Sequence, residues 1–549
     1  MNRLFLLILC LVCLASYFNS LNNNFVFDDK ALIIYNPLVK SPRLLPLIFK
    51  KDIYDYFWVG KVNSFDIMYR PMQLLTYFVD YKIWGLRPVG FHFVNILLHL
   101  FNSILIYYLL LRLFDNKKVS SIASILFLVH PIHTSVVSYI AGRADLLACF
   151  FMLLSILLFL RFIKVGIKGY LGLSLLFAAM ALLSRESAMI LFIFIALVLF
   201  SQKAKLKDYA PIVYFILLDL CYLVLRFLVF GKAGVLTHPI LLSFPLRLVN
   251  LFNIIPRYIS LLFMPSELHL LRVTPFIKSL SDTKTFFALV SILLYILLII
   301  KLRKNKLFIF SMLWFLIGIV PVFSYLDGYP KLFGAMMAES WVYIPSIGFF
   351  VIFAYILSSI KKLGSVIVIS FIAFYGLLTT VNNVYWKNDF LLHKRILQFN
   401  PGKNPIRRDL IDDYLYYGLY DDAKAEIEKF ASLDPRSPDL DILWGNYYFF
   451  TNKLDLAIEK YNRALNRNKH FFVLYRLSSC YKRLGQLDRA IYFGLESLKI
   501  SPDFELNLIQ LGDIYAQKQQ LNLAKAYYQM AYELNPHNKA LRDLIKNAE

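Results

Sequence analysis

Charged residues and cysteines are scarce in this chain of 549 residues. Charged side chains make up 17% of it and hydrophobic side chains 59%. A soluble globular protein of this size could not bury so much apolar surface, so the composition excludes that class. Only five cysteines are present, and four of them fall in apolar stretches. The sequence therefore argues against a disulfide framework.

Motifs for phosphate binding and for nucleophilic catalysis are also missing. The sequence has no glycine-rich phosphate loop, no dinucleotide-binding pattern and no Ser-His-Asp arrangement. Acidic residues are few, with 36 Asp and Glu against 59 Lys and Arg. From Gly402 onward the two signs nearly balance, at 21 basic and 20 acidic residues, so the basic excess lies in the first 401 residues. Membrane loops and anionic headgroups explain this distribution better than nucleic acid does.

Long apolar stretches are abundant, and they predict an all-α polytopic membrane domain over residues 1–385. We expect the first stretch to remain as a helix, because no small-x-small cleavage site precedes Asn22. The stretch Leu246–Pro265 carries Pro256 and Arg257 in its middle, so we expect it to lie at the outer surface or to re-enter the membrane. About eleven crossings are expected, at Leu4–Phe18, Val89–Leu111, Val119–Tyr139, Leu146–Ile163, Gly169–Leu183, Ser187–Phe200, Tyr209–Phe230, Phe286–Ile300, Leu307–Leu326, Tyr343–Ile360 and Gly364–Val381.

Basic residues are concentrated in alternate connections of this series. The connections rich in Lys and Arg are predicted to be cytoplasmic, together with the N-terminus. They carry Arg3, Arg112–Lys118, Arg161–Lys168, Lys203–Lys207, Lys301–Lys306 and Lys361–Lys362. The other short connections carry only Arg143, Arg185 and Lys331. The first outer loop (22–88), a second outer loop (231–283) and the C-terminal region are then extracytoplasmic, and a bacterial inner membrane is the expected location.

A periodic pattern fills residues 403–549, after a junction at 386–402. Small residues recur at steps of 34, 33 and 34, at Ala423, Ala457, Ala490 and Ala524. Tyrosines recur in the same rhythm, at Tyr414, Tyr448, Tyr481 and Tyr515. This spacing is typical of tetratricopeptide repeats, in which small residues let two helices touch. It predicts an α-solenoid whose concave face binds a polypeptide.

Ionisable residues near the outer ends of the predicted spans are the candidate functional residues, because such residues are costly near a membrane. Asp28 and Asp29 follow the first helix, where a carboxylate could be the general base of an enzyme with a lipid-linked donor; the alternative is a helix-capping pair. The others are Arg143 with Asp145, Arg185 with Glu186, Glu339, His130 with His133, and His99. For the charged pairs the alternative is a salt-bridged helix turn. For the histidines, packing or phosphate contact is favoured over metal binding.

Several short stretches also occur in a fixed order. They are Phe25–Asp29, Tyr69–Pro71, Gly90–Asn95 with Leu98–His99, His130–Thr134, Gly142–Asp145, Ser184–Glu186, Ala338–Glu339, Tyr343–Ser346, and Trp386–Asn388 with Asn400–Pro401 at the junction. As an ordered set they resemble the transmembrane, tetratricopeptide-containing O-mannosyltransferases and their bacterial relatives. The resemblance runs with gaps from about Phe25 to the C-terminus. The set is specific, whereas any single stretch is weak.

The resemblance implies a GT-C glycosyltransferase, which moves a sugar from a polyprenyl-phosphate carrier to a hydroxyl of a protein acceptor with inversion. Asp28 or Asp29 would take the proton of that hydroxyl. The residues implied in contact with the donor phosphate or lipid are Arg70, His130, His133, Arg143 and Arg185. The implied supporting residues are Asp145, Glu186, Glu339, His92 and His99. The donor would be an undecaprenyl- or dolichyl-phosphate sugar, the repeats would hold the acceptor, and neither a metal nor a nucleic acid is implied.

This chain departs from the family at two positions: it has Arg185 where Lys is common and Ser340 where Arg is common. One alternative is an enzyme that acts on lipid A, a cell-wall glycan or another envelope glycan. Another is a non-catalytic scaffold anchored in the membrane, for which Asp28→Asn and Asp29→Asn would leave function untouched. The sequence leaves open the sugar, the acceptor protein, any metal requirement, the oligomeric state and which aspartate is the base.

Overall fold

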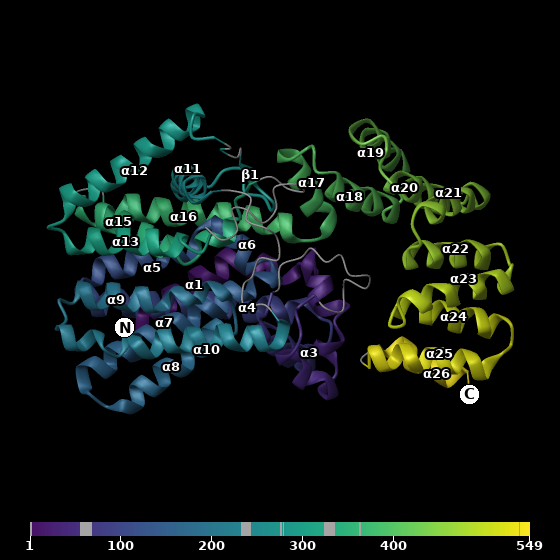
Figure 1. Ribbon diagram of the computed structural model, residues 1–549, viewed down its shortest axis with the longest axis horizontal. Coiled ribbons are helices and arrows are strands. Elements are labelled where there is room, and N and C mark those ends of the chain that lie inside the picture. Colours follow the sequence, from purple (N-terminus) through teal and green to yellow (C-terminus); the bar gives the residue numbers. More distant parts are fainter. Residues whose placement is uncertain are drawn as a thin grey trace.

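A computed structural model describes residues 3–54, 68–231, 243–274, 277, 279–322, 335–361, 364–536 and 538–548. The described residues are helical apart from loops and one two-residue antiparallel pair, β1 (Val273–Thr274) with β2 (Ala335–Met336). Figure 1 shows a bundle of long helices and, beside it, a stack of short helix pairs. This confirms the predicted fold class, a membrane-type helical domain followed by an α-solenoid.

The bundle is formed mainly by apolar helices. They are α1 (Arg3–Tyr17), α4 (Pro88–Phe114), α5 (Lys117–Val129), α7 (Arg143–Val165), α8 (Lys168–Leu182), α9 (Leu191–Ser201), α10 (Ile212–Phe230), α11 (Phe244–Phe263), α12 (Thr283–Leu302), α13 (Lys306–Ile319), α15 (Ser346–Ser359) and α16 (Gly364–Asn383). Shorter helices connect them. These are η1 (Phe18–Asn22), η2 (Lys30–Ile34), α2 (Pro37–Lys40), η3 (Pro42–Phe49), α3 (Pro71–Trp84), η4 (Pro131–His133), α6 (Thr134–Val137), η5 (Ile140–Gly142), η6 (Glu186–Ile190), η7 (Leu206–Tyr209), η8 (Glu339–Val342) and η9 (Val384–Trp386).

Among the described residues, seven helices are long and apolar enough to cross a membrane. The number becomes eight if the bent pair Lys117–Val129 and Pro131–Val137 is one span. This pair bends by 49° where the sequence suggests one straight span, because Pro131 cannot donate a helical hydrogen bond and its ring crowds the preceding turn. Four further apolar helices are shorter. The predicted count of about eleven crossings stays a prediction.

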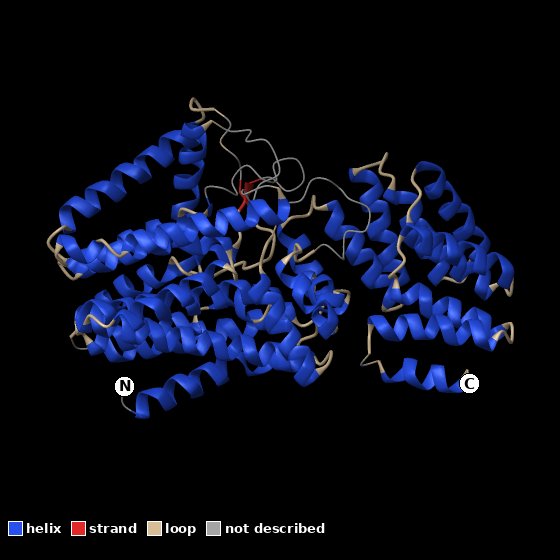
Figure 2. Ribbon diagram, turned by 60° about the horizontal axis from the view of Figure 1, so that its bottom comes forward, coloured by secondary structure: helices blue, strands red, loops and turns tan. Residues whose placement is uncertain are grey.

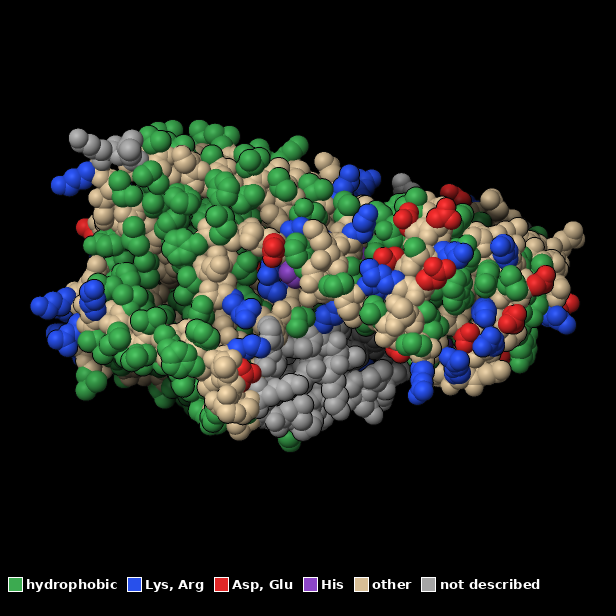
Figure 3. Space-filling view, turned by 90° about the horizontal axis from the view of Figure 1, so that it is seen from above, with side chains coloured by type: hydrophobic (Ala, Val, Ile, Leu, Met, Phe, Trp, Pro, Cys, Tyr) green, Lys and Arg blue, Asp and Glu red, His purple; other side chains and the backbone are tan. Residues whose placement is uncertain are grey.

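On the face of the molecule shown in Figure 3, hydrophobic side chains cover much of the bundle, whereas acidic and basic side chains intermingle over the solenoid. On α12, Phe286 and Phe287 are 65% and 67% exposed, and Leu228 of α10 is 75% exposed. Water does not tolerate an apolar surface of this extent on a soluble protein. The chain is therefore an integral membrane protein.

The predicted cytoplasmic connections lie together at one end of the bundle. Lys304 borders the same surface pocket as the end of α4. Lys118 Nζ donates a hydrogen bond to the Ser358 carbonyl oxygen (2.9 Å), and Gln202 Nε2 donates one to that of Leu113 (3.0 Å). The N-terminus is at this end as well, and the solenoid lies beyond the other end (Figure 1). Which end faces which side of a membrane stays a prediction, because the contacts fix only the grouping.

Helix α11 runs in a different direction from its neighbours. It is seen nearly end-on in Figure 1, whereas α12 and α15 run across the view. Asn250 anchors it to the following loop, because its Nδ2 donates to the Ile277 carbonyl oxygen and its Oδ1 accepts from the Ile277 N–H, both at 2.9 Å. This direction fits the predicted interfacial position, which stays a prediction.

The solenoid follows the bundle through α17 (Asp389–Phe399), which lies within the predicted junction. Its helices are α18 (Asn404–Tyr416), α19 (Tyr420–Leu433), α20 (Asp439–Phe450), α21 (Leu454–Arg467), α22 (Phe471–Arg483), α23 (Leu487–Ile500), α24 (Glu505–Gln517), α25 (Leu521–Leu534) and α26 (Lys539–Asn547). The four recurring alanines are all fully buried. At Gly512 an added Cβ would lie 2.4 Å from Tyr528 Cε1, so the helices of that pair touch where the spacing predicts small residues.

The solenoid contacts the membrane domain at both of its ends. Near its start, α17 packs against η9, and its Leu392 and Ile396 share an apolar cluster with Val26 of the first outer loop. Near its far end, Lys40 Nζ lies 4.0 Å from the Glu505 carboxylate, and Tyr81 Oη donates to Asn535 Oδ1 at 3.5 Å. Figure 2 shows the repeats beside one end of the bundle. The solenoid therefore lies next to the loop that carries the acidic pair.

Candidate active site

Asp29 is the buried member of the acidic pair. Its Oδ2 accepts a hydrogen bond from the Val26 N–H (3.0 Å), and its Oδ1 accepts one from the Ala141 N–H (2.7 Å). Burial raises the pKa of Asp29 well above its usual range, and the two N–H groups oppose this shift. Asp29 thus fastens the first outer loop to the turn that precedes α7.

Asp28 is only partly buried, and side chains surround it. Burial raises the pKa of its carboxyl, while the hydroxyls of Tyr139 and Tyr54 and the charge of Arg70 lower it. The Tyr139 hydroxyl has no hydrogen bond of normal length to any described residue. Two hydroxyls, a guanidinium and a carboxylate therefore lie close together here, which is suitable for binding a polar ligand.

Two ion pairs lie next to this group. Arg70 donates to Glu186 twice, from Nη2 to Oε1 at 2.9 Å and from Nε to Oε2 at 3.3 Å. Arg185 forms an ion pair with Asp145 at the start of α7. Since Arg185 and Glu186 are consecutive, the two pairs meet at the start of η6. The structure thus brings together four of the predicted residues from three distant parts of the chain.

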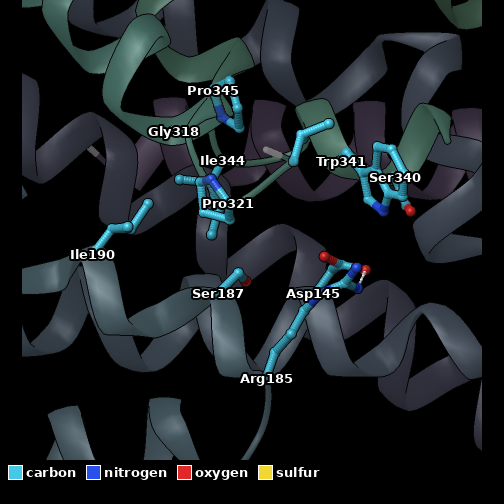
Figure 4. A pocket seen from close by; sticks show the side chains of 11 residues that line it. Asp145, Arg185, Ser187, Ile190, Gly318, Pro321, Ser340, Trp341, Ile344 and Pro345 are labelled. Atoms are coloured by element: carbon cyan, nitrogen blue, oxygen red, sulfur yellow. Dashed lines mark hydrogen bonds and ion pairs between the residues drawn. The ribbon is translucent and has the colours of Figure 1, made fainter. Parts of the chain in front are cut away.

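A cavity of about 30 Å³ borders the Arg185–Asp145 pair. Figure 4 shows Arg185 extending toward Asp145, with Ser340 and Trp341 on the opposite wall. The rest of the lining is formed by Ser187, Ile190, Gly318, Pro321, Val322, Ile344 and Pro345. A space of this size holds about two water molecules.

Arg143 is placed away from any open space. Its Nε donates to Asn95 Oδ1 (2.7 Å), its Nη2 donates to the Phe91 carbonyl oxygen (2.8 Å), and its Nη1 forms an ion pair with Asp80. The Tyr77 ring centre lies 4.7 Å from its guanidinium carbon. These contacts tie α7 to α3 and α4. The predicted phosphate contact of Arg143 is untested, and its surroundings favour a structural role.

His130 and His133 lie at the bend after α5 and are both buried. His130 Nε2 lies 3.1 Å from the Leu262 carbonyl oxygen. His133 Nδ1 lies 2.8 Å from that of Phe127, and its Nε2 lies 3.2 Å from Ser346 Oγ. Ring nitrogens that hydrogen-bond neighbouring helices in this way hold the bent span in shape. Their predicted contact with the donor stays a prediction.

His92 and His99 are buried in α4. His99 lies 2.7 Å from the Tyr343 hydroxyl and 3.0 Å from the Leu128 carbonyl oxygen. The ring nitrogens of His92 face the backbone of Asn23 and Asn24. Within the described part of the chain, no three His, Cys, Asp or Glu side chains lie close enough to hold a metal ion.

Glu339 begins η8 and binds the outer loop that follows α11. Its Oε1 accepts from the His269 N–H at 2.8 Å and faces Arg272 Nη2 at 3.3 Å. Burial raises the pKa of Glu339 to about 7, and the Arg272 charge and the His269 N–H oppose this shift. Arg272 thus supplies, from a distant loop, a positive charge that Ser340 does not provide next to Glu339.

Several residues at this site are not among the candidates predicted from the sequence. Tyr54 and Tyr139 face Asp28, Arg272 pairs with Glu339, and Asp389 contacts the acidic loop. None of them follows a predicted span in a recognised motif. The junction motif at Trp386 was the available signal, because this residue stacks on Tyr139 with ring centres 4.9 Å apart.

An apolar helical domain with an acidic first loop, paired charges at one end and a tetratricopeptide solenoid defines a class of integral membrane protein with an enzyme-like site. Comparison with known proteins narrows this class. Residues 71–230 match the family described as dolichyl-phosphate-mannose-protein mannosyltransferase, and residues 507–538 match the tetratricopeptide repeat.

Two similar proteins show how far the likeness extends. Protein O-mannosyl-transferase F38B6.6 of Caenorhabditis elegans is 28% identical over 452 residues, covering 78% of this chain and 63% of the relative. Protein O-mannosyl-transferase TMTC3 of Homo sapiens is 25% identical over 596 residues, covering 96% of this chain and 64% of the relative. The chain thus spans slightly less than two thirds of the length of these relatives. The resemblance to the transmembrane, tetratricopeptide-containing O-mannosyltransferases is confirmed.

One solved structure, that of MamA protein, aligns at 25% identity over 28% of this chain and 83% of that chain, with a TM-score of 0.22. A likeness this weak carries no argument about function.

Proposed function

We propose that this chain is a membrane glycosyltransferase that moves a sugar from a polyprenyl-phosphate donor to a hydroxyl of a protein acceptor, as in O-mannosylation. The different surroundings of the two aspartates carry the proposal. Asp29 is occupied by two backbone N–H groups, whereas the Asp28 carboxylate accepts from no backbone N–H of the described residues and lies near Arg70 and two tyrosine hydroxyls. The names of the similar proteins support the reaction and the class of acceptor.

Asp28 acts as the general base in this proposal. Its carboxylate takes the proton of the acceptor hydroxyl as the oxygen attacks the anomeric carbon. The bond between that carbon and the donor phosphate oxygen breaks, and its electron pair leaves with the phosphate. A single displacement of this kind inverts the anomeric centre. Because burial raises the pKa of Asp28, its carboxylate is a stronger base than an exposed aspartate.

Arg185 and Arg70 balance the charge of the leaving phosphate. Arg185 borders the cavity beside Asp145, and Arg70 acts on Asp28 while it is fixed by Glu186. Guanidinium groups suit phosphate because they offer parallel N–H donors. Arg143 has its donors directed at buried partners and is the weaker candidate.

The solenoid presents the acceptor in this proposal. Its far end contacts Lys40, which lies in the same outer loop as Asp28. A polypeptide bound by the repeats would therefore lie at the end of the bundle that carries the site. We place this end outside the cytoplasm, where a lipid-linked sugar on the outer leaflet is accessible, because the basic connections lie at the other end.

The test uses the organism that makes this chain. A deletion strain is complemented with the wild type, with Asp28→Asn or with Glu428→Gln, and membrane proteins are profiled by intact mass. Glu428 is an exposed carboxylate of α19, so its substitution makes the same change of charge away from the site. We expect the wild type and Glu428→Gln to restore the glycan and Asp28→Asn not to. Loss of a general base lowers the rate by about 10²–10⁴-fold.

Each other outcome identifies a different error. Full restoration by Asp28→Asn would show that this carboxylate is not the base. A change confined to lipid A or cell-wall glycan would show that the acceptor is not a protein. No glycan change in the deletion strain would favour the scaffold.

A further inference from the structure

We infer that Asp389, the first residue of α17, is a positioning residue that holds the catalytic carboxylate of Asp28 in place. The inference rests on the function proposed above. It extends that function by giving the junction before the repeats a role in the reaction.

The contacts of Asp389 bracket the acidic pair. Its Oδ1 accepts a hydrogen bond from the Phe27 N–H at 2.8 Å, and its Oδ2 forms an ion pair with Lys30. Phe27 and Lys30 are the residues immediately before and after Asp28 and Asp29. One side chain from a segment about 360 residues away therefore holds both flanks of the pair.

The turn at Phe27 needs such support. Its φ is +50°, in the left-handed region that a bulky L-residue rarely adopts. Asp28 is the next residue in the chain. If the hydrogen bond to the Phe27 N–H is lost, the turn can relax to a more favourable φ, and the Asp28 carboxylate then moves with it. Asp29, which belongs to the same loop, holds this turn through the Val26 N–H. Asp389, which belongs to α17, holds it through the Phe27 N–H.

The rest of the junction adds to this attachment. The Asn24 N–H donates to the Lys387 carbonyl oxygen at 2.9 Å, and Trp386 stacks on Tyr139. The Tyr139 hydroxyl is one of the groups that face Asp28. The junction therefore packs against one of the side chains that face the base, in addition to holding the loop that carries it.

The same helix also joins the solenoid. His393, four residues after Asp389, lies with its Nδ1 2.7 Å from Asp413 Oδ2 in α18. Helix α17 is thus fixed at its first turn to the acidic loop and further along to the first repeat helix. A polypeptide held by the repeats would meet the base at a distance that α17 sets.

A simpler role, capping α17, does not explain Asp389. The cap is Asn388, whose side chain accepts from the Leu391 N–H at 3.0 Å. The Asp389 carboxylate turns the other way, toward Phe27 and Lys30. Asn388 therefore stabilises the start of the helix, and Asp389 holds the loop that carries the base, so substitutions at the two residues test these roles separately.

The test compares Asp389→Ala, Asp389→Asn and the matched control Asn388→Ala, each as the full chain in lipid nanodiscs. A polyprenyl-phosphate mannose is the donor and a membrane protein modified only by the wild type is the acceptor. We expect Asp389→Ala to lower kcat by about 10²-fold with little change in the KM of the donor, since a small misplacement of a catalytic group has this effect. Asp389→Asn keeps an oxygen for the Phe27 N–H, so we expect it to recover most of the rate.

A second readout does not depend on turnover. Hydrogen exchange of the peptide that contains Phe27 should be faster in Asp389→Ala than in Asn388→Ala, which removes the cap but leaves the clamp. Equal exchange in these two variants, or equal kcat in them, overturns the inference. Failure of the proposed function looks different, because then the wild type and Asp28→Asn transfer no sugar. The exchange rates in that case still decide whether Asp389 holds the turn.

Discussion

Replacing Asp29 with alanine is the sharpest test of how the acidic pair is built. The substitution leaves two buried N–H groups, those of Val26 and Ala141, without their acceptor. An unsatisfied buried donor costs about 1–3 kcal/mol, so the pair of losses costs about 2–6 kcal/mol. Asp28→Ala removes no backbone contact of this kind. We therefore expect opposite effects: Asp29→Ala lowers stability strongly, whereas Asp28→Ala abolishes transfer and keeps most of the stability.

The effect of Asp29→Ala also depends on pH in a defined direction. Burial raises the pKa of Asp29 above its unfolded value, so the folded chain binds the proton more tightly. The wild type therefore loses stability as pH rises from the unfolded toward the folded pKa. The difference between wild type and Asp29→Ala should be larger at low pH and smaller at high pH.

Thermal unfolding of the purified chains in detergent, measured across pH, checks both expectations. Sugar transfer per folded molecule is measured on the same samples. The reasoning is refuted if Asp29→Ala and Asp28→Ala have the same melting temperature at every pH, because the two N–H groups would then have other acceptors. Asp29→Asn gives an internal scale, since it keeps one oxygen and should fall between alanine and wild type.

Three further variants test other parts of the chain. Because the pKa of Glu339 is about 7 in the folded chain instead of 4.5, the free energy of unfolding of the wild type should fall by about 3 kcal/mol as pH rises through that interval. Glu339→Gln should show no such fall. Melting temperatures that depend on pH in the same way in both chains would contradict this. Arg185→Ala frees Asp145 beside the cavity and should raise the KM of a polyprenyl-phosphate donor, so an unchanged KM in steady-state assays would exclude it from phosphate binding. Gly512→Ala forces a methyl against Tyr528 and should destabilise the last repeats by about 1–3 kcal/mol, which limited proteolysis would detect as faster cleavage.

Much of the fold could be predicted because its signals are local. Apolar runs and the alanine spacing are visible within one or two helices, and the buried alanines follow that spacing. The bend after α5 and the direction of α11 depend on packing against other segments. Pro131 and Pro256 mark positions where a helix can depart from a straight span. The sequence does not show whether the helix bends there, ends there or lies across its neighbours.

The candidate residues of the site could be predicted from motifs, but the contacts between them could not. Asp28 and Asp29 could be found because they directly follow the first span. Their different roles could not, since Ala141 lies 112 residues from Asp29 and Asp389 lies 362 residues from Phe27. Contacts over such separations arise from the tertiary fold, and no periodicity along the chain encodes them. A single sequence therefore predicts the candidates but not the partners that each of them contacts.

The attachment of the repeats at their two ends restricts how this protein can change. An array anchored at one end can gain or lose a unit freely, because its tip is unconstrained. Here an inserted unit would carry Glu505 and Asn535 past Lys40 and Tyr81, and a deleted one would leave them short. The number of repeats is thus set by the distance between the two places where the solenoid contacts the membrane domain.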